Sequence, residues 1–125
     1  MALILHVEDD APVRFLYKEV FEELGYDIIQ ANSAEEALQI LRKKKPDVII
    51  LDLKMPGIGG QGFLDKFHRM KAQIPIVVST AYPFMALDTS ALGADAYVIK
   101  SGDMDELVEK VSSLVKTKER PVPRT

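Results

Sequence analysis

The chain has 125 residues, of which 47% are hydrophobic, with a formal charge of −3 and no cysteine. This length fits one domain, no run approaches the ~20 apolar residues of a membrane helix, and disulfides and thiolate metal sites are excluded. The negative charge argues against general affinity for nucleic acid, so we expect a cytoplasmic domain without direct nucleic-acid or membrane contact.

Short apolar runs alternate with helical patterns along the whole chain. Five runs predict strands: residues 3–7, 27–31, 47–51, 74–80 and 96–99. Helices are predicted over 11–24, after Ser33, over 60–71, over a weakly patterned 84–92, and after Asp103. The run 47–51 is uniformly apolar after its first residue, which is typical of a central strand covered on both faces.

The predicted helices carry start signals and apolar repeats, and in the last helix we expect this repeat to face the core. Ser33 and Glu36 have the spacing of a capping box, and Asp103 is the expected N-cap of the last helix. Apolar residues recur three and four apart at Val13, Leu16, Val20 and Leu24, at Phe63, Leu64, Phe67 and Met70, and at Leu107, Val111 and Leu114. Residues 117–125 lack such a period, so we expect a domain over 1–116 and then a tail or linker remnant.

Five strand–helix pairs predict an α/β fold with a parallel sheet, right-handed crossovers and helices on both faces. In such folds the binding site lies beyond the carboxyl ends of the strands. Glu8 and Asp9 follow the first strand, Asp52 follows the third, and Thr80 and Lys100 lie at the ends of the fourth and fifth. We therefore expect these five residues to converge at one edge of the sheet.

This set of side chains fits phosphoryl chemistry. Clustered carboxylates repel one another unless a cation intervenes, and oxygen ligands without histidine or cysteine favour Mg²⁺. A hydroxyl and an ammonium opposite the metal would bind the oxygens of a phosphoryl group. Asp52, at the centre, is then the candidate nucleophile that forms an aspartyl phosphate.

Four blocks of the chain carry a family resemblance: "ILHVEDD", "PDVIILDLKMPGIGG", "PIVVSTAY" and "GADAYVIK". In order and spacing, over residues 2 to about 116, they resemble the receiver domains of response regulators in two-component signalling. The resemblance implies a flavodoxin-like (βα)5 doubly wound sandwich with strand order 2-1-3-4-5. It also implies a signalling phosphoacceptor, which catalyses only its own phosphorylation and slow dephosphorylation.

The resemblance assigns a role to each residue of the constellation. Asp52 matches the phosphoacceptor, Thr80 the hydroxyl and Lys100 the ammonium that contact the phosphoryl group, and Tyr97 the aromatic switch. The metal residues that it implies are Asp9 as a direct ligand, Glu8 through water, Asp52, and the backbone carbonyl of Lys54. Asp10 receives no role.

The family also implies partners. A histidine kinase or histidine phosphotransferase is expected to dock at Pro12, Val13 and Leu16, with a further target protein downstream. Lys54 and Tyr82 flank the expected path of the hydrolytic water, and neither suits a base, so slow dephosphorylation is expected. This pair resembles that of the stand-alone receiver of the sporulation phosphorelay.

Two questions stay open at the level of sequence. Many family members have a proline with a cis peptide after the lysine, whereas Ser101 follows Lys100 here, and a cis bond before serine costs about 2.5–4 kcal/mol. The alternative to a stand-alone receiver is a fragment of a larger regulator whose output domain, for example a DNA-binding one, has been removed. Outside the constellation, we expect His6 to pack against a helix and His68 to be exposed.

Overall fold

The computed structural model describes residues 2–55, 57–81, 93–100 and 104–119. Its strands are β1 (Leu3–Val7), β2 (Asp27–Ala31), β3 (Val48–Leu51), β4 (Ile76–Thr80) and β5 (Ala96–Ile99). They form one sheet in the order β2-β1-β3-β4-β5, and every neighbouring pair is parallel. The predicted fold class and strand order are confirmed.

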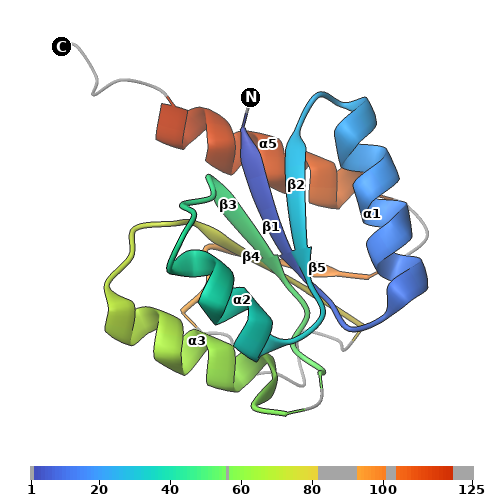
Figure 1. Ribbon diagram of the computed structural model, residues 1–125. Helices are drawn as coiled ribbons and strands as arrows, with labels where there is room; N and C mark the ends of the chain where they lie inside the picture. The colour runs from blue at the N-terminus through green and yellow to red at the C-terminus, as the bar shows by residue number, and fades with distance from the viewer. Residues whose placement is uncertain (1, 56, 82–92, 101–103, 120–125) are drawn as a thin grey trace, which may run out of the picture.

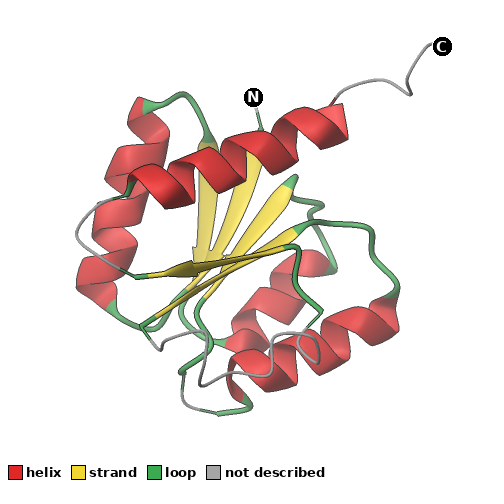
Figure 2. Cartoon of the chain, turned by 180° about the vertical axis from the view of Figure 1, so that it is seen from behind, coloured by secondary structure: helices red, strands yellow, loops and turns green. Residues whose placement is uncertain are grey.

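The helices cover both faces of this sheet, as Figures 1 and 2 show. They are α1 (Ala11–Glu23), α2 (Ala34–Leu41), α3 (Gly59–Met70) and α5 (Asp105–Glu119). Helices α1 and α5 pack on one face, and α2 and α3 on the other. The helix expected over 84–92 and the expected cap Asp103 lie outside the described residues.

The last helix is longer than the sequence predicts. Helix α5 continues to Glu119, so its backbone enters the stretch expected to be a tail. The domain boundary itself remains a prediction. Among the described residues, no helix has the length and apolar character needed to cross a membrane.

Two helix starts are stabilised by side-chain caps. The hydroxyl of Ser33 accepts the Glu36 N–H (3.0 Å) and the Glu36 carboxylate accepts the Asn32 N–H (2.7 Å), which confirms the start predicted for α2. At α1 the cap is Asp10, whose carboxylate accepts the Val13 N–H at 3.2 Å. Asp10, to which the family resemblance assigns no role, is therefore a structural residue.

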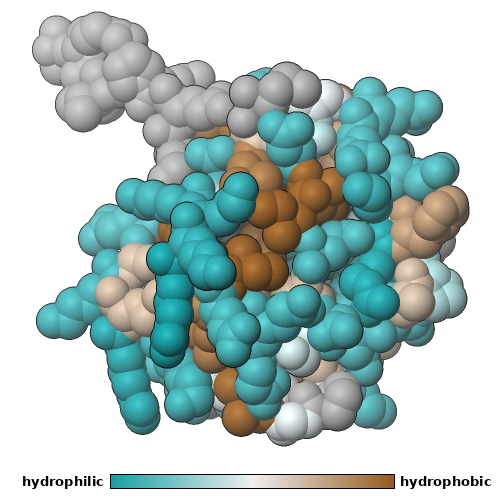
Figure 3. Space-filling model, in the orientation of Figure 1, coloured by the Kyte–Doolittle hydropathy of each residue, from teal (hydrophilic) through white to brown (hydrophobic). Residues whose placement is uncertain are grey.

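Each face of the sheet has its own core. The α2/α3 core contains Leu5, Val7, Ile49, Leu51, Phe63, Leu64, Phe67, Ile76 and Val78 among its buried members. The α1/α5 core contains Ile4, Tyr17, Phe21, Val48, Ile50, Val77, Val98, Leu107, Val111 and Val115. Figure 3, which views the α2/α3 side, shows a band of hydrophobic residues between hydrophilic side chains.

The apolar repeat of α1 coincides only in part with the face that the helix buries. In α1 the buried residues are Tyr17 and Phe21, whereas Leu16 and Leu24 are 44% and 53% exposed. The helix has more apolar residues than one face can bury, so spacing alone could not select the inward stripe. Met70 at the end of α3 is also exposed.

In α5 the prediction is nearly right. Leu107 and Val111 are buried as expected, and Val115 joins them. Leu114 is only partly buried against the same core.

Candidate functional site

The loop after β3 folds back closely on the strand end, and its glycines make this possible. Gly57 has a φ of +77°, a conformation that side-chain-bearing residues rarely adopt. A Cβ at Gly60 would lie 2.6 Å from Leu53 Cα and 2.8 Å from the Asp52 carbonyl oxygen. Since both of these atoms are backbone, only glycine fits beneath Asp52.

Three carboxylates meet at the carboxyl ends of β1 and β3. One oxygen from each of Glu8, Asp9 and Asp52 lies within 4.8 Å of the others. Glu8 and Asp52 are buried, whereas Asp9 is exposed. The pocket above them has a volume of about 300 Å³, and its lining is completed by Asp10, Lys54, Ala81 and Lys100.

Lys100 provides the opposing charge. Its ammonium lies 2.8 Å from Glu8 Oε1 and 3.4 Å from Asp52 Oδ1. Burial lowers the pKa of Lys100, but the hydrogen bond to Glu8 and the charge of Asp52 outweigh it, and the net pKa is raised. Lys100 therefore stays charged, and its charge offsets those of the two acids.

The surroundings of the Glu8 carboxyl group shift its pKa. Burial raises its pKa to about 7, and the charge of Asp52 adds to the rise, while the contact with Lys100 opposes it. Glu8 Oε1 is buried, and the Lys100 ammonium lies 2.8 Å from it. A buried acid next to two further carboxylates is a suitable environment for a divalent cation.

Backbone and helix contacts fix the acids in place. The Asp10 N–H donates to Glu8 Oε2 (3.3 Å), and the Lys54 N–H donates to Asp52 Oδ1 (3.4 Å). The guanidinium of Arg14, on the first turn of α1, donates to the Glu8 carbonyl at 2.8 Å. Sequence reasoning missed Arg14, because its contact is to a backbone atom and leaves no pattern of residue types.

Of the remaining expected residues, Thr80 lies at the same edge of the sheet, whereas Tyr97 lies near the start of β5. Thr80 is fully buried at the end of β4, and its carbonyl accepts the Lys100 N–H at 2.6 Å, which joins the ends of β4 and β5. Tyr97 is partly buried against the α2/α3 core, and its hydroxyl accepts the Ala94 N–H at 3.2 Å. Tyr82 and the Lys100–Ser101 peptide lie outside the described residues.

The surface of α1 beside this pocket is apolar. Pro12 is exposed, Leu16 is 44% exposed and Phe15 is 67% exposed, while Val13 is partly buried against the α1/α5 core. Of the three residues expected to form a partner surface, Val13 therefore contributes least, and Phe15 was missed.

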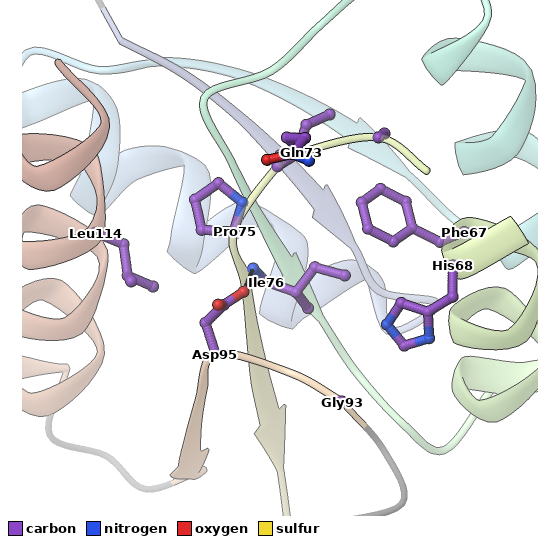
Figure 4. Close-up of a pocket in the computed structure, with 10 residues that line it drawn as sticks. Phe67, His68, Gln73, Pro75, Ile76, Gly93, Asp95 and Leu114 are labelled. Carbon is purple, nitrogen blue, oxygen red and sulfur yellow. Dashed lines mark hydrogen bonds between the residues drawn. The ribbon is translucent and has the colours of Figure 1, made fainter. Parts of the chain in front are cut away.

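A second cavity, of about 490 Å³, lies at the opposite edge of the sheet. Figure 4 shows Leu114 on one side of it, Phe67 and His68 on the other, and Asp95 at the start of β5 between them. The Asp95 carboxylate already accepts the Ile76 N–H at 2.8 Å. This cavity lacks the acid cluster and the ammonium of the first pocket, so it is not the candidate site.

Comparison with known proteins agrees with the geometry. Residues 4–112 match the family described as "Response regulator receiver domain". The chain belongs to this family. It is therefore a signalling receiver domain rather than an enzyme in the usual sense.

Two relatives give the comparison detail. The sporulation initiation phosphotransferase F of Bacillus subtilis is 33% identical over 117 residues, which cover 92% of this chain and 94% of that protein. The response regulator TrrA of Thermotoga maritima, solved in complex with Mg²⁺-BeF, is 41% identical with a TM-score of 0.84, covering 91% of this chain and 99% of TrrA.

TrrA has also been solved in complex with the histidine kinase ThkA; that structure has a TM-score of 0.83 and 41% identity, and covers 91% of this chain and 98% of TrrA. Other relatives are longer. The probable transcriptional regulator ycf27 of Porphyridium aerugineum is 32% identical over 115 residues, 90% of this chain, and the chain spans about half of its length, 48%.

Proposed function

We propose that Asp52 is the phosphoacceptor of this receiver domain, and that it takes a phosphoryl group from a histidine kinase or a histidine phosphotransferase. The observation that carries this proposal is the cluster of Glu8, Asp9 and Asp52 within 4.8 Å, with the Lys100 ammonium 3.4 Å from Asp52. Such a set can hold and neutralise a phosphoryl group beside a nucleophilic oxygen.

In the proposed reaction a carboxylate oxygen of Asp52 attacks phosphorus. The bond from phosphorus to the donor atom, a histidine nitrogen or the oxygen of a small acyl phosphate, breaks, and its electron pair leaves with the donor. The Lys100 ammonium and the Thr80 hydroxyl bind the phosphoryl oxygens. Lys100 is already 3.4 Å from Asp52, so it needs little reorganisation to do so.

Mg²⁺ is the proposed cofactor, held by Asp9, Asp52 and the backbone carbonyl of Lys54, with Glu8 in support. The donor set fits this ion, since carboxylate oxygens of Glu8, Asp9 and Asp52 lie within 4.8 Å of one another, and such hard oxygen ligands suit Mg²⁺. When bound, Mg²⁺ supplies the positive charge that offsets the carboxylates and the incoming phosphoryl oxygens.

The test is labelling with acetyl phosphate and Mg²⁺, followed by the mass of the intact protein. We expect one phosphoryl adduct on the wild type and none on Asp52→Ala. Asp65→Ala is a matched control, because Asp65 is an exposed aspartate on α3 outside the pocket. An adduct that survives Asp52→Ala would contradict the assignment.

The proposed docking surface for the phosphodonor consists of Pro12, Val13, Phe15 and Leu16 at the start of α1. Pro12, Phe15 and Leu16 are exposed and Val13 is partly buried, and all four are apolar and follow the acidic residues of the pocket. Leu16→Glu should slow phosphotransfer from the cognate kinase and leave labelling by acetyl phosphate intact. Equal loss of both reactions would indicate misfolding instead.

The proposed output is a change in partner binding on phosphorylation, with Tyr97 as the switch and the aspartyl phosphate lost slowly. Lys54 is exposed at the pocket, and with Tyr82 it offers no base for the hydrolytic water. We expect the adduct to outlast that of the Lys54→Asn/Tyr82→Glu double variant once acetyl phosphate is removed. Equal decay rates would show that these residues do not set the lifetime.

We further propose a cytoplasmic location. The alternative interpretation, a receiver that belongs to a larger regulator with an output domain, has support in the chain's coverage of about half of a probable transcriptional regulator. The length of the native reading frame decides between the two.

A further inference from the structure

Three polar side chains lie inside the α1/α5 core, directly below the acidic pocket. His6, Tyr17 and Ser79 are 1%, 5% and 2% exposed, among neighbours that are otherwise aliphatic or aromatic. Burying polar groups is unfavourable unless they find partners. Their contacts with one another therefore offset the cost of burying this group of three residues, which we call the buried polar layer.

Tyr17 is the centre of this layer. Its hydroxyl lies 3.0 Å from the Ser79 hydroxyl, and its ring stacks on His6 with centroids 4.4 Å apart and planes 12° apart. The other side of His6 is held by Gln30, whose amide lies 3.1 Å from Nδ1 and also donates to the Arg14 carbonyl at 2.7 Å. One side chain of α1 is thus connected to β1 by stacking and to β4 by a hydrogen bond.

The hydrogen bond reaches the strand end that borders the phosphoacceptor. Leu51 of β3 pairs with Val78 of β4, and the next residues along the two strands are Asp52 and Ser79. Because side chains alternate along a strand, these two share the face of Ile50 and Val77, which both lie in the α1/α5 core. Ser79 is therefore beside Asp52, and Thr80 follows it.

The charged groups of the acidic pocket affect the pKa of Tyr17. Burial raises the pKa of its phenol, the hydrogen bond to Ser79 and the charge of Lys100 lower it, and the Glu8 and Asp52 carboxylates raise it, with a net rise. The hydroxyl is accordingly protonated at neutral pH, and in its hydrogen bond with Ser79 either hydroxyl can be the donor.

We infer that Tyr17 is a positioning residue: its hydroxyl holds Ser79, and with it the carboxyl end of β4, so that Thr80 is fixed relative to Asp52. The inference rests on the proposed function, since it assigns Tyr17 a part in phosphoryl capture at that site. A residue of this kind acts on the rate, because small displacements of groups around a reacting atom reduce reactivity. It also connects the buried side of α1, whose exposed side is the proposed docking surface, to the reacting residues.

The experiment measures the rate of labelling by acetyl phosphate at saturating Mg²⁺, well below the unfolding temperature. Tyr17→Phe keeps the ring on His6 and removes only the hydroxyl. We expect the rate to fall about fivefold, the factor that corresponds to one hydrogen bond between neutral groups. Ser79→Ala should give a similar loss, and the double variant should be no slower than either single variant, since both remove the same bond.

Two further variants separate positioning from stability. Ser79→Thr keeps a hydroxyl and should restore the wild-type rate. Phe21→Leu is the matched control: Phe21 is fully buried on the same face of α1 with its ring 6.4 Å from that of Tyr17, so the variant weakens packing without touching a hydrogen bond. It should lower the melting temperature and leave the rate unchanged.

The possible results separate the two proposals. If the wild type is labelled and Tyr17→Phe is labelled equally fast, the positioning role is refuted and the proposed function stands. The positioning role is also refuted if Phe21→Leu slows labelling as much, or if the effects of Tyr17→Phe and Ser79→Ala multiply. If the wild type takes no phosphoryl group, the proposed function and this inference are both overturned.

Discussion

The two faces of the sheet are packed with different chemistry. The α2/α3 face is packed with hydrophobic residues and with one buried polar residue, Thr80, which shares the strand face of Val78. On the α1/α5 face lie His6, Glu8, Asp52 and Ser79, which are four of the five buried polar or charged residues among those described; the fifth is Thr80.

The difference follows from strand alternation. Every second residue of β1 points to the same side, so the positions of Ile4 and His6 lead directly to Glu8. The acidic site thus lies at the carboxyl-terminal end of the α1/α5 face. On the same face, His6 and Ser79 are buried polar side chains that need hydrogen-bond partners. Thr80 is the one buried polar residue on the α2/α3 face among the residues described, so this core can contribute mainly stability.

The largest effect is expected on the apolar face. Phe63 is fully buried between α3 and the sheet, so Phe63→Ala should lower the free energy of unfolding by about 3–5 kcal/mol, measured by urea denaturation. Met70, on the same helix but 43% exposed, is the control, and Met70→Ala should change stability by about 0.5 kcal/mol or less. Similar losses at both positions would mean that α3 does not pack as described.

On the α1/α5 face, the buried His6 should make the stability of the protein depend on pH. Burial, with contributions from Lys100 and Arg14, lowers the pKa of His6 to about 3 from its usual 6.5. Between these values the unfolded chain binds a proton that the folded protein does not, so stability is full above pH 6.5 and is lost as the pH falls.

The measurement compares the wild type with His6→Phe, which keeps a ring against Tyr17. On acidification below pH 6.5 the wild type should lose about 1.4 kcal/mol per pH unit more than the variant, or about 3 kcal/mol by pH 4.5. Glu8, whose pKa is raised to about 7, acts in the opposite direction, but it is present in both proteins and cancels to first order. A difference independent of pH would mean that His6 is open to solvent.

The smallest effect concerns the metal at the upper end of the polar face. At 100 times its Kd, Mg²⁺ should stabilise the wild type by about 2.7 kcal/mol, read as a rise in Tm. Asp9→Asn should lose most of this rise. Asp10→Asn should keep it, because Asp10 caps α1 and asparagine caps equally well. The reverse pattern would exchange the roles of these neighbouring acids.

The sequence was sufficient for the fold and for much of the site because both depend on local patterns. Apolar runs and helical spacing predicted each strand and helix that the structure describes, and the position of Glu8, Asp9, Asp52, Thr80 and Lys100 at strand ends predicted their meeting at one edge. The convergence needs only that parallel strands end together.

What could not be predicted depends on tertiary contacts. Residues 13 to 24 of α1 contain apolar side chains on several sides, and only the position of the sheet decides that Tyr17 and Phe21 are buried while Leu16 and Leu24 are not. The bond of Tyr17 to Ser79 joins residues 62 apart in sequence, and Arg14 contacts a carbonyl. Neither interaction leaves a trace in composition or spacing.

Three consecutive residues of α1 face different surroundings. Phe15 and Leu16 are exposed, while Tyr17 is buried against His6 and Ser79. Each residue of a helix is rotated by about 100° from the last, so one turn can present separate side chains to a partner and to the core. At the docking surface proposed above, substitutions of Phe15 and Leu16 would therefore require no repacking beneath, so pairing specificity could diverge between duplicated copies of such a domain.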